Sequence, residues 1–277
     1  MISNYVRIRY DSIMKRHLRL IDYIENLQKQ GRYLFLKKEA SLALSISENA
    51  LQNSITRLSK KGKVAHLKKG LYQIIPVEYK IAGSLPPEWF IHDLMALLGI
   101  PYYIGLLSAA AFYGSTHQAA QIFQAVCQKK IPDLNIGGLK ICFYASKDFS
   151  VIPTQDMKTQ AGYVRISTPE GTAFDLIRYL HQSGHLNHVA TLLNELEEKI
   201  NAKKLAFVGQ KLSLRYSQRL GYLFDILGHE SLTDPLHQFI TKKKLRYIPL
   251  RPDKPANNVE RNAKWHILIN ERVEPDL

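Results

Sequence analysis

The stretch from residue 36 to residue 75 constrains the fold more than any other part of this chain. Within it, residues 47–61 place Leu51, Ile55 and Leu58 at helical spacing on one face. Such spacing predicts an amphipathic helix. Because the following residue is a glycine, the helix is expected to end there.

The opposite face of this predicted helix is polar without being acidic, and cations follow toward its end. Amide and hydroxyl side chains can donate to and accept from base edges, whereas cations suit phosphates. The pattern is therefore typical of a DNA recognition helix. Its predicted contact residues are Ser47, Asn49, Gln52, Asn53, Thr56, Arg57, Lys60 and Lys61.

The residues on either side of the helix support this interpretation. Upstream, residues 37–43 read as a short helix, and a connector at 44–46 leads to a serine cap at Ser45 or Ser47, the spacing of a helix-turn-helix. Downstream, two predicted strands at 64–67 and 71–75 surround a turn that contains a glycine, which predicts a hairpin or wing. The remaining predicted DNA contacts lie at the short helix and at this turn: Lys37, Lys38, Lys68 and Lys69.

The charge of the chain is concentrated in the same region. The 277 residues carry a formal net charge of +14, and the sequence pI is about 9.6. Residues 1–80 hold 16 Lys and Arg against 6 Asp and Glu, a net of +10, which leaves +4 for the remainder. A polyanionic partner for the N-terminal region is therefore expected.

The predicted fold class is α+β, with an N-terminal winged helix-turn-helix domain at residues 1–80 and a mixed α+β domain at 88–277. A proline-rich linker at 81–87 separates them. A first helix is expected over 17–29, preceded by a basic lead-in at 1–16 that is either an arm that reaches DNA or a frayed end.

The C-terminal domain is expected to alternate helices and strands. Ser167 and Glu170 match a capping box, so one helix is expected to start there and to continue through Leu180. The other predicted helices span residues 88–98, 106–113, 186–201, 212–227 and 234–243. The predicted strands span residues 121–127, 139–144, 162–166, 246–250 and 265–269.

The two cysteines, Cys127 and Cys142, form no C-x-x-C pair, so neither a disulfide framework nor a thiolate zinc site is indicated. No apolar run is long enough to span a membrane, and the N-terminus is too polar for a signal peptide. A reduced, cytoplasmic setting without membrane contact is therefore expected.

The motifs of enzymes are weak or missing. A nucleotidyltransferase needs clustered carboxylates, yet no D-x-D or D-x-E occurs in the chain after the Gly-Ser pair at 114–115 or elsewhere. Asp133 and Glu197 could supply the carboxylates of a nuclease site. Glu197 lies in a predicted helix, however, and a solvent-exposed face explains the acidic residues of that helix more simply. No nucleophile elbow and no phosphate loop are present, so neither catalysis nor a cofactor is predicted.

Metal binding has one candidate, a group of three histidines at positions 181, 185 and 188. They would share a helix face, but a Ser-Gly pair at 183–184 interrupts the helix, and no carboxylate or cysteine completes a site. No metal is therefore predicted. Binding of single-stranded RNA by the basic stretch is also disfavoured, because Tyr72 is its only aromatic residue between 36 and 75.

Two segments carry a family resemblance. Residues 102–114 read YYIGLLSAAAFYG, and residues 167–177 read STPEGTAFDLI, both behind the predicted winged helix. In this order and spacing the chain resembles the AbiEi family, whose members are antitoxins and transcriptional repressors of type IV toxin–antitoxin, or abortive infection, operons. The resemblance spans most of residues 17–200, and no motif matches beyond about residue 201.

The resemblance implies a repressor that binds inverted repeats of double-stranded operator DNA. It also implies an antitoxin that counteracts a nucleotidyltransferase-like toxin without a stable complex. The oligomeric state is open between a dimer on a symmetric operator and one monomer on each repeat. The alternative function is a non-catalytic module that binds structured RNA or a protein partner.

Overall fold

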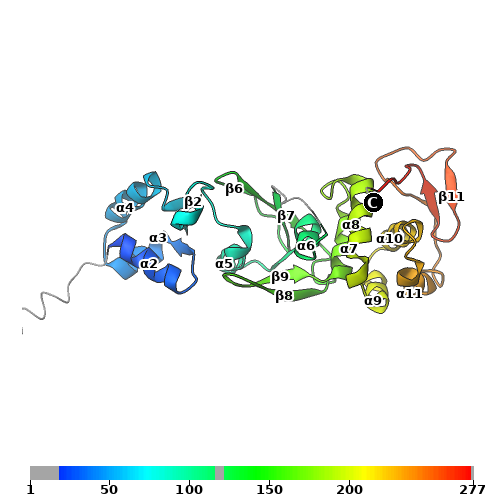
Figure 1. The fold of residues 1–277 in the computed structure, drawn as a ribbon, viewed down its shortest axis with the longest axis horizontal. Helices are drawn as coiled ribbons and strands as arrows, with labels where there is room; N and C mark the ends of the chain where they lie inside the picture. Colours follow the sequence, from blue (N-terminus) through cyan, green and yellow to red (C-terminus); the bar gives the residue numbers. More distant parts are fainter. Residues whose placement is uncertain (1–18, 116–121, 276–277) are drawn as a thin grey trace, which may run out of the picture. The chain divides into compact units, whose positions relative to one another are not determined.

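The computed structural model describes residues 19–115 and 122–275, and these form two compact units (Figure 1). The first unit runs up to Leu94 and includes Leu134–Leu139 and Thr159–Gly162; the second unit holds the rest. The basic lead-in predicted at residues 1–16 lies outside the described residues.

Up to Ile74 the described part of the first unit contains three helices and a three-stranded sheet. The helices are α2 (Leu20–Lys29), α3 (Lys37–Leu44) and α4 (Glu48–Lys60). The strands are β1 (Leu34–Leu36), β2 (Val64–Lys68) and β3 (Leu71–Ile74), paired antiparallel in the order β1-β3-β2. The arrangement is consistent with a winged helix-turn-helix. The predicted helices and hairpin are confirmed, whereas β1 was not predicted.

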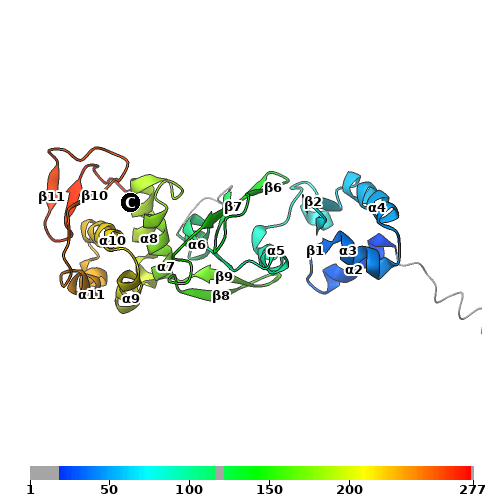
Figure 2. The ribbon, with the colours of Figure 1, turned by 180° about the vertical axis from the view of Figure 1, so that it is seen from behind.

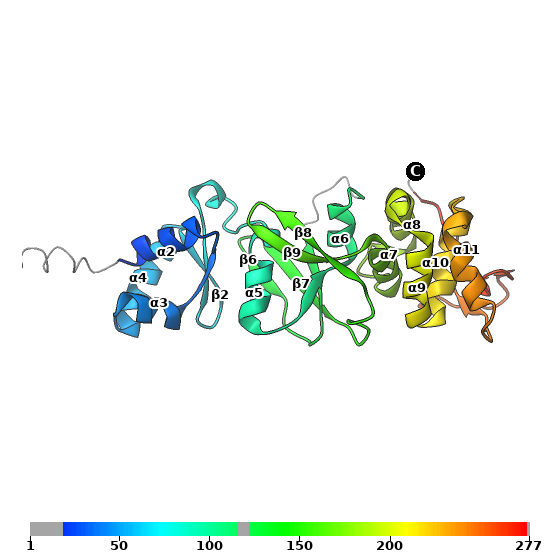
Figure 3. The same ribbon diagram turned by 90° about the horizontal axis from the view of Figure 1, so that it is seen from below.

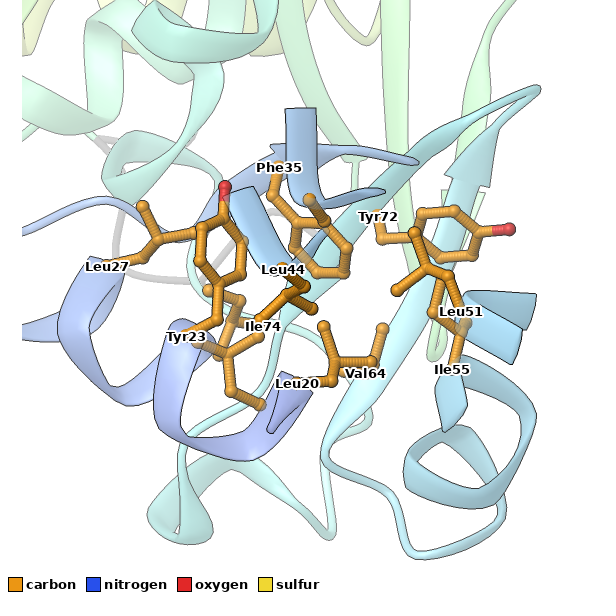
Figure 4. Packing of buried hydrophobic residues seen from close by; sticks show 12 residues of the cluster. Leu20, Tyr23, Leu27, Phe35, Leu44, Leu51, Ile55, Val64, Tyr72 and Ile74 are labelled. Atoms are coloured by element: carbon orange, nitrogen blue, oxygen red, sulfur yellow. The ribbon is translucent and has the colours of Figure 1, made fainter. Parts of the chain in front are cut away.

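One hydrophobic core holds these elements together, as Figure 4 shows. Leu51 and Ile55 of α4 are at most 2% exposed and pack with Leu44 of α3 and Val64 of β2. Phe35 of β1 is fully buried and joins this cluster. The third helix is therefore fixed by its apolar face, which leaves its opposite face free for contact.

The segment predicted as a linker follows β3. Two short 3-10 helices, Val77–Tyr79 and Pro87–Trp89, flank it. The Trp89 ring lies 5.5 Å from Tyr33 and 5.3 Å from Tyr79, centroid to centroid. These aromatic contacts tie the segment to the first unit, so it does not run free of the fold.

A six-stranded mixed sheet in the order β6-β7-β5-β4-β9-β8 follows (Figure 1). Its strands are β4 (Tyr102–Ile104), β5 (Ile122–Cys127), β6 (Leu134–Ile136), β7 (Leu139–Ala145), β8 (Thr154–Thr159) and β9 (Gly162–Ser167). The central strand β4 pairs antiparallel with β5 and parallel with β9, where Ile104 faces Ile166. Strands β5, β7 and β9 were predicted; β4, β6 and β8 were missed.

The helix expected to start with a capping box at Ser167 and Glu170 begins differently. It is α7 (Pro169–Arg178), and its N-cap is Thr168, whose side chain accepts from the Gly171 N–H. Glu170 instead accepts from the backbone N–H of Asn201 at 3.0 Å. The capping-box prediction was wrong, because Glu170 forms a long-range contact in place of a local one.

A buried ion pair lies on α7. Asp175 is fully buried, and its Oδ1 accepts from Arg178 Nη1 at 2.8 Å. Arg178 also contacts Ser146 and Asp148. Burial raises the pKa of Asp175 to about 6, although Arg178 and Tyr103 favour its ionised form.

Of the remaining helices, the one at residues 106–112 packs on β5, and those between residues 185 and 240 form a helical group with α7 (Figures 2 and 3). These remaining helices are α5 (Ile91–Leu98), α6 (Leu106–Phe112), α8 (His185–Leu196), α9 (Ala202–Lys211), α10 (Leu214–Ile226) and α11 (Glu230–Ile240). A 3-10 turn at Glu197–Lys199 ends the helix that the sequence extended to residue 201. The helix α9 was missed. No helix among the described residues is long and apolar enough to cross a membrane.

A small sheet of β10 (Ile248–Pro249), β12 (Ile267–Ile269) and β11 (Glu260–Asn262) closes the second unit. Trp265 anchors it to α10: the ring is fully buried, and its Nε1 donates to Asp225 at 2.6 Å. Gln218 of α10 donates to the carbonyls of Trp265 and Arg246, both at 3.0 Å. This anchoring needs Gly221, because a Cβ there would lie 2.3 Å from the Trp265 ring.

Candidate nucleic-acid interface

Helix α4 presents the polar face predicted from the sequence. Asn49, Asn53 and Thr56 are exposed, and Gln52 is half-buried. These side chains share the face opposite Leu51 and the rest of the apolar stripe, so burial of that stripe turns them outward. The face can both donate and accept hydrogen bonds along its length.

The start of the helix is fixed by a turn and a cap. Ser45 ends α3 in the left-handed conformation, with φ of 51°, and Ser41 Oγ donates to the Ile46 carbonyl at 2.8 Å. Ser47 is the N-cap, and its hydroxyl accepts from the Ala50 N–H at 3.3 Å. Of the two predicted caps, Ser47 is therefore correct and Ser45 is the turn. The cap keeps Ser47 at the entrance of the polar face.

Two of the predicted contact residues on this helix bond to its backbone. Thr56 Oγ1 donates to the Gln52 carbonyl at 2.9 Å, so its hydroxyl is left with lone pairs that accept. Arg57 Nε lies 3.4 Å from the Asn53 carbonyl, and the Arg57 side chain is exposed. Thr56 is consequently suited to an amino group as partner, and Arg57 to an anion.

The basic start of α3 is tied to the wing. The Lys37 backbone N–H donates to the Gly70 carbonyl at 2.7 Å. The Lys37 ammonium lies 3.7 Å from a Glu48 carboxylate oxygen, and Glu48 is the first residue of α4. Lys38 is exposed beside it. These contacts hold the first turns of α3 and α4 and the wing tip in one arrangement.

The wing tip carries the two predicted lysines. Lys68 ends β2, Lys69 follows in the turn, and both are exposed. Gly70 has a φ of 74°, a left-handed conformation that a side chain would strain, so glycine suits this turn. The hairpin therefore places two adjacent cations at an exposed point.

A hollow of about 690 Å³ lies between α4 and the wing. It brings together part of the predicted set: Lys37, Lys38 and Gln52 line it with Lys69. Gly70 of the predicted wing turn also lines it, and the sequence reasoning missed the other four residues of its wall. These are Leu36, Glu48, His66 and Tyr72.

His66 and Tyr72 could have been found from the hairpin register. They are cross-strand partners in β2 and β3, and their rings lie 5.3 Å apart.

The remaining predicted residues do not line the hollow. Lys60 and Lys61 are exposed at the far end of α4. The predicted contact surface, which runs from Lys61 to the wing, therefore extends beyond the hollow.

The residues considered for a nuclease have other partners. Asp133 accepts from the Phe143 N–H and lies 3.8 Å from Lys140. Glu197 lies 3.8 Å from His229. Both carboxylates thus belong to separate local contacts.

The histidines considered for zinc are also engaged within the fold. The His181 and His185 rings lie 5.4 Å apart, and Arg251 donates to His185 Nδ1 at 3.1 Å if that nitrogen is the unprotonated one. Among the described residues no group of three or more His, Cys, Asp or Glu is placed to hold a metal ion.

Comparison with known proteins connects the chain with one family. Residues 103–226 match the AbiEi antitoxin C-terminal domain. No curated protein matches the sequence.

Among solved structures, the RV2827C protein from Mycobacterium tuberculosis superposes with a TM-score of 0.64 at 14% identity. The match covers 88% of this chain and 89% of that one. It shows a shared fold. The antibiotic-resistance factor ANT(2'')-Ia matches at a TM-score of 0.27 and 10% identity, covering 54% of this chain and 93% of its own, and this supports no structural argument.

The family match includes α6 and α7 and covers nearly all of the two segments on which the resemblance in the sequence rests, residues 102–114 and 167–177. Residues 103–226 are therefore similar to the C-terminal domain of AbiEi antitoxins.

Proposed function

We propose that the first unit is a winged helix-turn-helix that binds double-stranded operator DNA in a sequence-specific manner. The observation that supports this most is the exposed polar face of α4 beside a hollow lined by Lys37, Lys38 and Lys69. The proposed contacts remain those predicted from the sequence: Lys37, Lys38, Ser47, Asn49, Gln52, Asn53, Thr56, Arg57, Lys60, Lys61, Lys68 and Lys69.

The dimensions of α4 suit the major groove. Its 13 residues correspond to about 20 Å of helix, at about 1.5 Å per residue. The major groove is about 12 Å wide and admits one α-helix, whose amides can bond bidentately to adenine. Asn49, Gln52 and Asn53 supply such amides, and the lysines of the wing would lie against the phosphates.

The family match supports an antitoxin role for the second unit, and hence a cognate toxin as functional partner. We propose that the protein is a transcriptional repressor and antitoxin of a type IV system. In this role it counteracts a nucleotidyltransferase-like toxin in the cytoplasm, without a stable complex, and has no catalytic activity of its own.

The decisive experiment is a titration of the full chain against its own upstream DNA and against a scrambled duplex of equal length, at near-physiological salt. A preference for the upstream DNA of about a thousandfold or more would establish sequence-specific binding. Equal, salt-sensitive affinity for both would refute the operator proposal and favour the alternative, a module that grips structured RNA by charge and shape.

Asn49→Ala is expected to weaken operator binding by about 5- to 150-fold, because a bidentate base contact contributes about 1–3 kcal/mol. Affinity for the scrambled duplex should stay unchanged, since Asn49 carries no charge. The matched control is Ser54→Ala in the same helix, whose hydroxyl already donates to the Ala50 carbonyl. An equal loss on both duplexes would contradict base readout by Asn49.

Lys69→Ala is expected to lower the affinity for both duplexes by a similar factor. It should also reduce the slope of log affinity against log salt by about 0.9, as the loss of one phosphate contact does. The matched control is Lys147→Ala, which removes an exposed lysine of the second unit. Binding isotherms at several salt concentrations measure the slope, and an unchanged slope would remove the wing tip from the interface.

A further inference from the structure

The second unit contains two long stretches without any acidic residue. Residues 199–224 include six Lys or Arg and no Asp or Glu, and residues 235–252 include five and none. Arg219 and Arg251 among them are buried, but the others are exposed. Uncompensated surface charge of this kind favours a polyanionic ligand.

The fold brings the two stretches together, because α9 and α11 pack against each other (Figures 1 and 3). Gly209 of α9 permits the close packing: a Cβ at this position would lie 2.5 Å from Leu236 of α11. Gly209 lies in the last turn of α9, and Leu236 lies in the C-terminal half of α11. The C-terminal halves of the two helices therefore pack together, and Lys211 and Lys243 follow these contacts along the chain.

Aromatic rings accompany these lysines. Lys211 Nζ lies 3.9 Å from the centroid of the Phe207 ring, and Lys243 Nζ lies 5.4 Å from that of Phe239. Phe207 is 57% exposed although its neighbours along α9 are buried. An exposed phenylalanine on a basic surface has no role in the core of the unit, which makes it available for a ligand.

We propose that this α9–α11 surface binds single-stranded nucleic acid. We define the surface by Lys204, Phe207, Lys211, Phe239, Lys243 and Lys244. The lysines would neutralise phosphates, while unpaired bases stack on the rings, as in known single-strand binders. A duplex keeps its base faces inside the helix, so it could use the lysines but not Phe207. The exposed ring therefore favours a single strand over a duplex.

This binding site is independent of the proposed operator contacts. It lies entirely in the second unit, whereas the proposed contacts lie in the first. The basic stretch of the first unit has Tyr72 as its one aromatic residue between 36 and 75. The two surfaces therefore differ in the chemistry they offer, and either can fail without the other.

The test uses the full chain carrying Lys68→Ala and Lys69→Ala, which weakens nucleic-acid binding by the first unit. Fluorescence anisotropy is measured with labelled oligouridylate and oligothymidylate of about twelve nucleotides, within the range of known single-strand sites. A duplex of equal length serves as the third probe. The two single strands separate RNA from DNA as the source of the ligand.

Phe207→Ala in this background is expected to lower the affinity for the single strands by about 5- to 150-fold, the effect of losing one stacked base. The affinity for the duplex should stay unchanged. Tyr163→Ala is the matched control, because Tyr163 is 62% exposed and also belongs to the second unit. An unchanged affinity in Phe207→Ala, or an equal loss in Tyr163→Ala, would overturn the proposal.

Lys211→Ala with Lys243→Ala provides a second readout. Each lost phosphate contact should reduce the salt slope for a single strand by about 0.7. A reduced slope together with the Phe207→Ala effect supports the site. If Phe207→Ala lowered the affinity for single strands and duplex equally, the proposal would be overturned, because base stacking would then play no part.

Discussion

Gly221→Ala is expected to lower the free energy of unfolding of the second unit by about 2 kcal/mol, the net of about 3 kcal/mol for overpacking a core and about 1 kcal/mol of regained helix propensity. The new Cβ would lie 2.3 Å from two carbons of the Trp265 ring and 2.5 Å from a third. The ring cannot move aside, because it is fully buried and its Nε1 is bonded to Asp225. The higher helix propensity of alanine, about 1 kcal/mol, offsets only part of the steric cost.

Urea unfolding followed by circular dichroism measures this loss. Two controls isolate its cause. Arg215→Ala places an alanine at an exposed position of the same helix and should change stability by no more than about 0.5 kcal/mol. In a Trp265→Leu background the ring is gone, so Gly221→Ala should become neutral or stabilising. A full loss in that background would mean that the clash is not with Trp265.

Asp175→Asn is expected to abolish a pH-dependent contribution of about 3 kcal/mol to the free energy of unfolding. Burial raises the pKa of Asp175 from 3.8 to about 6 in the folded state. The folded state therefore holds this proton more tightly than the unfolded state does. The stabilisation from protonation is fully present below about pH 4 and is lost as pH rises through about 6.

The measurement compares the unfolding free energies of wild type and Asp175→Asn at pH 4 and pH 7.5. Other groups titrate in both proteins and cancel in the difference. A Trp89→Phe background leaves Trp265 as the only tryptophan, so fluorescence reports on the second unit. Asp148→Asn, which removes the other carboxylate on Arg178, should keep most of the wild-type slope. Parallel pH profiles in all three proteins would refute the assignment to Asp175.

Local sequence signals were sufficient to predict the parts of the first unit that matter for binding. The apolar period and Ser47 defined α4 to within one residue at either end, because cap and period act within one or two turns. Gly70 similarly defined the wing. Strand β1 was missed because its pairing with β3 depends on residues almost forty positions away.

Dependence on residues far away in the sequence also explains the errors in the second unit. Glu170 follows the capping-box pattern but bonds to Asn201, 31 residues away. Helix α9 was missed because its Gly209 lowers the helix propensity of a short segment, while the packing on α11 that this glycine permits compensates. In the candidate interface, the hairpin register could have indicated His66 and Tyr72, whereas Glu48 joins the hollow only because the fold places α4 beside the wing.

The position of β4 at the centre of the six-stranded sheet also affects how the chain is made. All three residues of β4 are buried, yet its parallel partner β9 begins only at Gly162, nearly sixty residues later. At about 5–20 residues per second, β9 leaves the ribosome about 3–12 s after β4. During this interval the nascent chain carries an apolar strand with one unpaired edge. Aggregation is therefore a greater hazard during translation than in the finished protein.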